Sequence, residues 1–185
     1  MGRIGNFNFT QIARGNNASN RTSTLWMNSG TSGKLHQEIT GGNGNLSNST
    51  AISTIRNGSV NSIDVTQLIT GGHANATNDV LLSRNENTHE KIVQGIDIAS
   101  GSARNTIREG YFDPRSGDYT QVALVGSGSA SNSLVRNTFA GNVRVDQLAS
   151  GTTARNDAHL SGIGGSATVF QEAEGNGATN NLVIG

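Results

Sequence analysis

The sequence contains no cysteine, a single proline and few aromatic residues, which make up 4% of its 185 residues. The lack of cysteine excludes disulfide bonds and thiolate chemistry. No apolar run approaches the length that spans a membrane, so we expect no membrane insertion. Residues 1–10 also lack the apolar stretch of a secretory signal peptide, which is therefore either absent or already removed.

Neither sign of charge is in excess, because 13 basic residues balance 13 acidic ones. A nucleic-acid-binding protein usually carries a basic face, so this balance argues against such a partner. Hydrophobic residues make up only 33% of the chain. Disordered chains usually combine such low hydrophobicity with a high net charge, which this chain lacks. A folded chain of this composition needs another source of cohesion, and repetition of hydrogen-bonded side chains supplies one.

Glutamine recurs along the whole chain at intervals of about 27 residues, which indicates an internal repeat. Its positions are Gln11, Gln37, Gln67, Gln94, Gln121, Gln147 and Gln171. Each Gln is followed by a small apolar residue and, two positions later, by Asn. These pairs are Ala18 with Asn20, Leu46 with Asn48, Ala76 with Asn78, Ala103 with Asn105, Ala130 with Asn132, Ala154 with Asn156 and Ala178 with Asn180. Residues 1–185 are therefore interpreted as a single repeat domain.

Apolar residues recur at every second position around each Gln, as at Ile63, Val65 and Ile69 about Gln67, and again after each Asn, as at Ala158 and Leu160. A period of two is typical of strands with one buried face. Each repeat is read as a strand, a tight turn, a second strand and a looser turn. Because one such unit cannot bury its apolar face alone, we predict an all-β fold, a parallel β-solenoid with two main strands per coil and about seven coils.

The Gln residues are in phase with the apolar residues, which places them inside the solenoid. An amide both donates and accepts hydrogen bonds, so a stack of identical amides satisfies itself. We therefore predict a structural ladder of inward Gln side chains, the alternative being Gln side chains exposed on the surface. The Asn column either forms a second ladder or bonds the local backbone at a bend.

The stretches FNFTQIARGNNASN at 7–20 and SIDVTQLITGGHANATN at 62–78 resemble the curlin repeats of bacterial curli subunits. The likeness extends over residues 7–184. It implies an extracellular or cell-surface protein whose subunits stack into amyloid-like fibres of the matrix, with roles in adhesion and biofilm and with a nucleator or secretion partner. The present repeat is longer, lacks the second Gln of the curlin pattern and places Ala before Asn rather than after it.

No catalytic, cofactor or metal site is predicted from the sequence. The four histidines, at positions 36, 73, 89 and 159, lack metal-ligand spacing on a shared strand face. Asp113 and Asp118 lie in the least repetitive segment, 110–118, which is interpreted as a plain turn, a contact loop or a Ca²⁺ site. Acidic residues fall too irregularly for a polysaccharide-acting β-helix enzyme, so the protein is not expected to be an enzyme.

Four aliphatic residues directly follow a Gln and therefore point outward if the Gln points inward. They are Ile12, Leu68, Val122 and Leu148. Along the axis they form either a stripe for lateral contact or singly exposed side chains that need no explanation.

The two ends of the repeat pattern carry apolar residues instead of the polar cap that usually closes a solenoid. Phe7 and Phe9 begin the first strand pattern, and Leu182 and Ile184 lie in the last. We predict that these four residues form a polymer interface between copies stacked head to tail. The leading hypothesis is a structural subunit of a fibre, and the alternative is a discrete solenoid stalk, adhesin segment or virion binding module.

Overall fold

The computed structural model describes residues 4–54, 59–83, 86–110 and 116–185, and these residues form an all-β protein. The strands are β1 (Phe7–Arg14), β2 (Ser19–Met27), β3 (Ser32–Gly41), β4 (Gly44–Thr54), β5 (Ser59–Ser83), β6 (Glu86–Glu109), β7 (Ser116–Ala140), β8 (Asn142–Ser150), β9 (Thr153–Ile163), β10 (Ala167–Glu174) and β11 (Gly177–Ile184). The described residues contain no helix that could cross a membrane.

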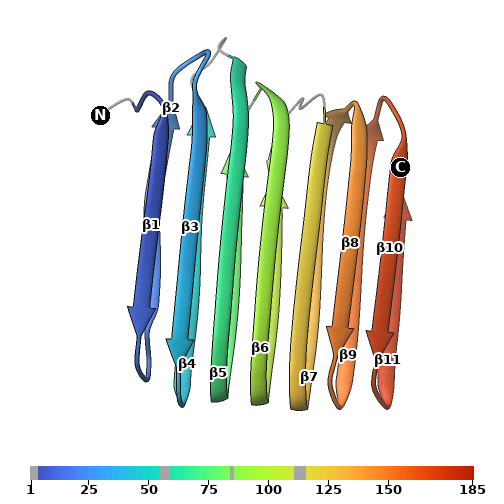
Figure 1. Cartoon of the computed structure of the whole chain (residues 1–185). Coiled ribbons are helices and arrows are strands. Elements are labelled where there is room, and N and C mark those ends of the chain that lie inside the picture. The colour runs from blue at the N-terminus through green and yellow to red at the C-terminus, as the bar shows by residue number, and fades with distance from the viewer. Residues whose placement is uncertain (1–3, 55–58, 84–85, 111–115) are drawn as a thin grey trace.

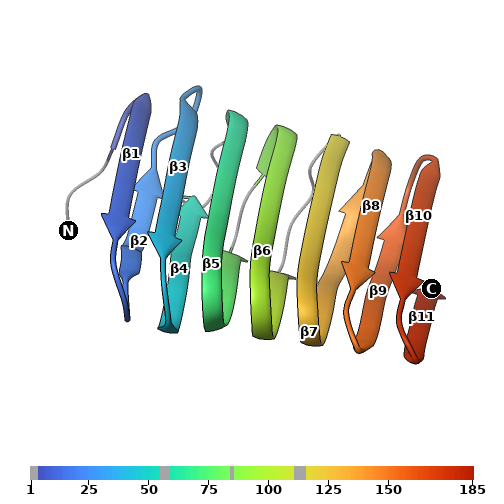
Figure 2. The ribbon, with the colours of Figure 1, turned by 60° about the horizontal axis from the view of Figure 1, so that its bottom comes forward.

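The strands stack in parallel in the order β1-β3-β5-β6-β7-β8-β10, with β2, β4, β9 and β11 in a second layer (Figure 1). The long strands β5, β6 and β7 bend around the tight turn and contribute to both layers (Figure 2). Partners in neighbouring turns of the chain lie about 27 residues apart, which confirms the predicted parallel β-solenoid. We number its coils from the N-terminus: coil 1 is β1 and β2, coil 2 is β3 and β4, coils 3, 4 and 5 are β5, β6 and β7, coil 6 is β8 and β9, and coil 7 is β10 and β11.

The register aligns the repeat in columns along the solenoid axis. Each Gln pairs with the Gln of the next coil, from Gln11 opposite Gln37 to Gln147 opposite Gln171. Each Asn does the same in the second layer, from Asn20 to Asn180. A single-residue slip would turn every apolar side chain to the opposite face, so burial itself fixes this register.

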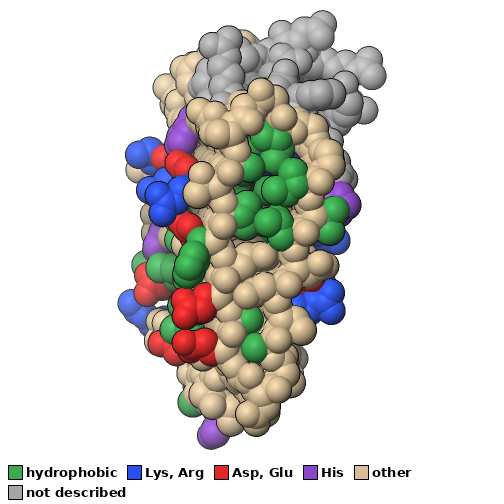
Figure 3. Space-filling model, turned by 90° about the vertical axis from the view of Figure 1, so that its right-hand side faces the viewer, with side chains coloured by type: hydrophobic (Ala, Val, Ile, Leu, Met, Phe, Trp, Pro, Cys, Tyr) green, Lys and Arg blue, Asp and Glu red, His purple; other side chains and the backbone are tan. Residues whose placement is uncertain are grey.

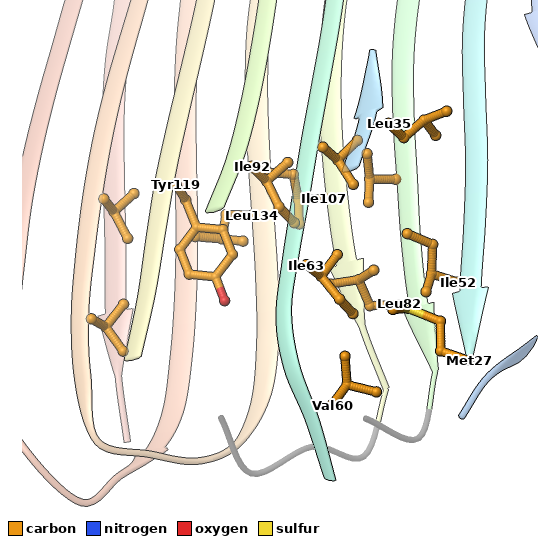
Figure 4. Close-up of a cluster of buried hydrophobic side chains, with 14 of the residues drawn as sticks. Met27, Leu35, Ile52, Val60, Ile63, Leu82, Ile92, Ile107, Tyr119 and Leu134 are labelled. Carbon is orange, nitrogen blue, oxygen red and sulfur yellow. The ribbon is translucent and has the colours of Figure 1, made fainter. Parts of the chain in front are cut away.

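The Gln and Asn columns divide the buried core into two apolar halves. The half toward the looser turns holds bulky side chains that point toward one another from facing strands, among them Leu35, Ile63 and Leu82 (Figure 4). The half toward the tight turns holds mostly Ala and Ile, such as Ala103 and Ile96. Each buried Ile or Leu contributes about 1.5–3 kcal/mol through burial of apolar surface.

Glycine closes the tight turn where successive coils approach most closely. Gly101 and Gly128 have φ values of 116° and 134°, in the region that disfavours other residues. A Cβ on Gly101 would overlap the carbonyl oxygen of Ala74 in the coil beneath. In coils 4 and 5 the turn therefore requires glycine both for its conformation and for the close stacking of coils.

Candidate functional site

The Gln column is a continuous chain of side-chain hydrogen bonds inside the solenoid. The Nε2 of each Gln donates to the Oε1 of the Gln in the preceding coil, at 2.6–2.9 Å. The second N–H of the amide reaches across the coil to a backbone carbonyl, as from Gln94 to Thr106 at 3.0 Å. The structure therefore has the inward arrangement, and each interior Gln amide has hydrogen-bond partners for both its nitrogen and its oxygen.

The Asn column is also a ladder, but it runs in the opposite direction. The Nδ2 of each Asn donates to the Oδ1 of the Asn in the following coil, at 2.9–3.1 Å. The members of this ladder, in order along the axis, are Asn20, Asn48, Asn78, Asn105, Asn132, Asn156 and Asn180.

The interior members of the Asn ladder are buried and make a second kind of bond. Asn48, Asn105 and Asn156 have no exposed surface. Each donates to a backbone carbonyl of the following coil as well as to the next Asn: Asn48 to Leu68 at 3.1 Å, Asn105 to Val122 at 2.8 Å and Asn156 to Glu172 at 2.6 Å. Of the two alternatives that the sequence left open, the structure has the ladder, and the accompanying backbone bonds go to the following coil rather than to the local backbone at a bend. The amide dipoles of the two columns oppose each other.

The direction of the ladders leaves hydrogen-bonding groups facing outward at both ends of the solenoid. On coil 1, one N–H of Gln11 and the side-chain carbonyl of Asn20 point along the axis away from coil 2. On coil 7, the side-chain carbonyl of Gln171 and one N–H of Asn180 point along the axis away from coil 6. Each end therefore presents one donor and one acceptor, at positions that match those of the opposite end.

The C-terminal end exposes a cross-section of the core. Leu182 and Ile184 are 44% and 55% exposed, although they occupy the columns in which Ala158 and Leu160 are buried one coil below. Figure 3 shows hydrophobic side chains gathered at the centre of this end, with acidic side chains beside them. Among the described strands, β10 pairs only with β8 and β11 pairs only with β9. Coil 7 is therefore an uncovered template of strands and apolar side chains.

The N-terminal end is covered in part by its own residues. Phe7 is only 8% exposed because its ring fills the space over Gly33, whereas Phe9, stacked on it, is 41% exposed. Ile4 forms backbone hydrogen bonds beside Met27 at the end of β2. Of the four residues predicted at a polymer interface, Phe9, Leu182 and Ile184 thus lie on exposed ends, and Phe7 is largely buried against coil 2.

A cluster of ionisable side chains, which we call the buried ionic cluster, interrupts the apolar core in coils 4 and 5. It consists of Glu90, Glu109, Tyr119 and Arg136, all of them buried. The Tyr119 hydroxyl lies 2.7 Å from Glu90 and 2.6 Å from Glu109, and Arg136 lies 3.0 Å from Glu109 and faces the Tyr119 ring. Inside the protein, the Tyr119 hydroxyl therefore lies between two carboxyl groups, and one of them, Glu109, pairs with Arg136.

Burial raises the pKa of the Glu109 carboxyl well above its ordinary value, and the nearby charge of Glu90 raises it further, against the opposing effect of Arg136. Burial likewise raises the pKa of the Tyr119 hydroxyl. The raised pKa favours the neutral form of the Glu109 carboxyl, in which the cluster has less excess negative charge. The repeat pattern did not reveal this site, although carboxylates in otherwise apolar columns are a signal that the sequence contains.

The remaining residues considered from the sequence do not form a chemical site. His36, His73, His89 and His159 lie in different columns; His89 contacts Ser116 and lies 4.0 Å from Asp118. Asp113 falls outside the described residues. Within the described ranges, no three His, Cys, Asp or Glu side chains are grouped to hold a metal ion.

The outward aliphatic residues that follow the Gln column do share a column. Glu38 separates Ile12 from Leu68, and Gly95 separates Leu68 from Val122. Val122 and Leu148 are direct neighbours, but the apolar surface along the column is interrupted at Glu38 and Gly95, so it does not form a continuous stripe.

Comparison with known proteins identified no relative of this chain: no family model, curated protein or solved structure matches it. The similarity to curlin repeats remains a resemblance between short sequence patterns. The functional argument therefore depends on the geometry of the solenoid and of its two ends.

Proposed function

We propose that the protein is a structural subunit that stacks head to tail with copies of itself, coil 7 of one copy on coil 1 of the next, to form a fibre. The observation that carries this proposal is the uncovered cross-section of coil 7, where Leu182 and Ile184 are exposed in columns that are buried elsewhere. A contact between two different faces does not close on itself and generates a filament when no ring forms.

The second copy supplies what each end lacks. The parallel register continues across the joint, with β10 beside β1 and β11 beside β2. Gln171 then accepts a hydrogen bond from Gln11 of the next copy, and Asn180 donates to Asn20. An unsatisfied amide that becomes buried costs roughly 1–3 kcal/mol, so the match between ends favours this register over others.

The cover on coil 1 is compatible with this joint. Ile4 lies beside Met27 of β2. In the stacked register, Ile184, the last residue of β11, would lie beside Leu25 of β2, because both residues belong to one column. Ile4 thus lies just beyond the part of β2 that β11 would contact. The same partial cover is the observation that favours the rival function, a discrete stalk, adhesin segment or virion binding module.

The setting of such a fibre is proposed from the sequence resemblance alone. Similarity to curlin repeats supports an extracellular or cell-surface fibre with a role in the matrix and adhesion, assembled with a nucleator or secretion partner. The role is structural rather than enzymatic, since the polar interior is used by the amide ladders and the buried ionic cluster.

The test compares a wild-type solution with two variants by electron microscopy and light scattering over a range of concentrations. Wild type is expected to form fibres with a spacing of about 4.8 Å along the axis. Leu182→Asp places a charge in the core cross-section and should block growth, since burying an unpaired charge is costly.

The matched control is Val183→Asp, one residue away. Val183 lies in the outward column of His159, so this variant should assemble far better than Leu182→Asp. A wild-type protein that stays monomeric at high concentration would support the discrete module instead.

A further inference from the structure

The end coils carry opposite charge. Residues 7–27, which span coil 1, contain Arg14 and Arg21 and no acidic residue. Residues 167–184, which span coil 7, contain Glu172 and Glu174 and no basic residue. The two faces that would meet in the proposed fibre therefore have charges of +2 and −2.

We propose that Arg14 of one copy forms an ion pair with Glu174 of its neighbour, and that this charge pairing selects the head-to-tail orientation. The inference rests on the proposed function. The register places both residues in one outward column, which runs from Arg14 through Thr40 and Thr70 to Ser150 and Glu174. Stacking coil 1 on coil 7 brings Arg14 and Glu174 one coil apart, with both side chains at the surface.

The solenoid already contains ion pairs of this kind between neighbouring coils. Lys34 of coil 2 lies 3.7 Å from Asp64, its column neighbour in coil 3. Arg108 of coil 4 lies 3.1 Å from Asp79 of coil 3. A separation of one coil is therefore within the reach of a basic and an acidic side chain.

The orientation has to be selected because the amide ladders alone do not define it. Turning one copy over about a two-fold axis across the joint would bring the outward N–H of Gln11 to the carbonyl of Asn20 in the other copy. Head-to-head contact would therefore also satisfy these amides. It would, however, place two positive faces together, and tail-to-tail contact two negative faces. Like charges across an interface disfavour the wrong partner, whereas opposite charges favour the right one.

The test uses Arg14→Glu and Glu174→Arg, assayed separately and as an equimolar mixture at low salt. Each variant alone brings like charges together and should raise the critical concentration for assembly by about two- to fivefold, the range expected for an exposed ion pair.

The mixture restores an ion pair at every joint between the two variants. At one kind of joint the introduced glutamate meets the introduced arginine, and at the other the native Arg14 meets the native Glu174. The mixture should therefore assemble like wild type. The double variant, which carries both changes in one chain, should do the same.

Two controls separate the charge pair from other effects. Arg104→Glu makes the same charge change on the exposed surface of coil 4 and should leave the critical concentration near the wild-type value. At 1 M salt, where the Debye length is about 3 Å, the differences between variants should largely disappear.

The inference is overturned if Arg14→Glu and Glu174→Arg each assemble as wild type does at low salt, or if their mixture is no better than either alone. In both cases the proposed fibre stands, because wild type still assembles. Absence of assembly by wild type overturns the fibre and the charge pair together.

Discussion

The amide columns and the buried ionic cluster both place polar groups in the core, but they satisfy these groups in different ways. In the columns, every Gln and Asn bonds an identical residue one coil away, and the same solution recurs along the axis. In the cluster, unlike residues complement one another once, in coils 4 and 5 only. We therefore expect the repeated columns to tolerate the loss of one member better than the cluster does.

The difference arises from charge and from column neighbours. Glu90 occupies the column of Ile63, and Arg136 the column of Leu160, so neither residue has a neighbour of its own kind. Gly117 leaves space for the cluster, because a Cβ there would lie 2.7 Å from the Tyr119 ring. A neutral amide column stays neutral when one member is lost, whereas the cluster becomes unbalanced.

The largest effect is expected from Arg136→Leu, which leaves Glu90 and Glu109 buried without their cation. Breaking a buried pair in this way costs about 3–5 kcal/mol, which urea unfolding of the dilute monomer would measure. As a control, Arg136→Leu combined with Glu90→Ile and Glu109→Leu restores the residue types of these columns and should recover most of the loss. Equal destabilisation of the single and triple variants would contradict a charge-balance role.

Substitutions of Gln94 test how the amide columns respond to a charge and to the loss of one amide. Gln94→Glu introduces a charge between two amides and should cost several kcal/mol, whereas Gln94→Leu only interrupts the chain of bonds and should cost about 1–3 kcal/mol. Thermal unfolding of both variants at neutral pH measures the difference. If Gln94→Glu were as stable as wild type, the column could not be buried as described.

The smallest effect concerns the pH dependence of stability. The folded-state pKa of Glu109 is raised above its unfolded value, so the protonated group contributes stability that is present at low pH and is lost as pH rises through the folded pKa. Tyr119, whose pKa is also raised, acts in the same direction at higher pH. Glu109→Gln should therefore flatten the decline in unfolding free energy that begins as pH rises above the ordinary carboxyl pKa, and an unchanged slope there would exclude Glu109 as its source.

The sequence was sufficient to predict the columns because their signal recurs. A single Gln67 or Asn78 would have been ambiguous, but seven equally spaced copies in phase with apolar residues define strand, face and register together. The solenoid class followed from the same repetition, because no single coil can bury its own face.

Three features could not be predicted, because they depend on contacts that are not part of the repeat pattern. The sequence is silent on the direction of each ladder, since an amide donates and accepts equally well. Burial of Phe7 depends on the space over Gly33 in the next coil. The ionic cluster joins residues of two coils, Glu109 and Arg136 among them, whose pairing becomes visible only when the columns are aligned.

The most direct test of the proposed head-to-tail joint uses the absence of native cysteine. Asn8 and Thr168 are exposed and lie at opposite ends of one outward column. Across the joint their Cα atoms would be about 4.8 Å apart, which is within the range that a disulfide spans. Mild oxidation of the variant carrying Asn8→Cys and Thr168→Cys should give a ladder of multimers that a reductant removes. The control pair Asn8→Cys and Thr179→Cys, with its second cysteine in the other layer, should give none. Equal ladders from both pairs, no ladder from the first, or efficient dimers from Asn8→Cys alone would contradict the head-to-tail joint.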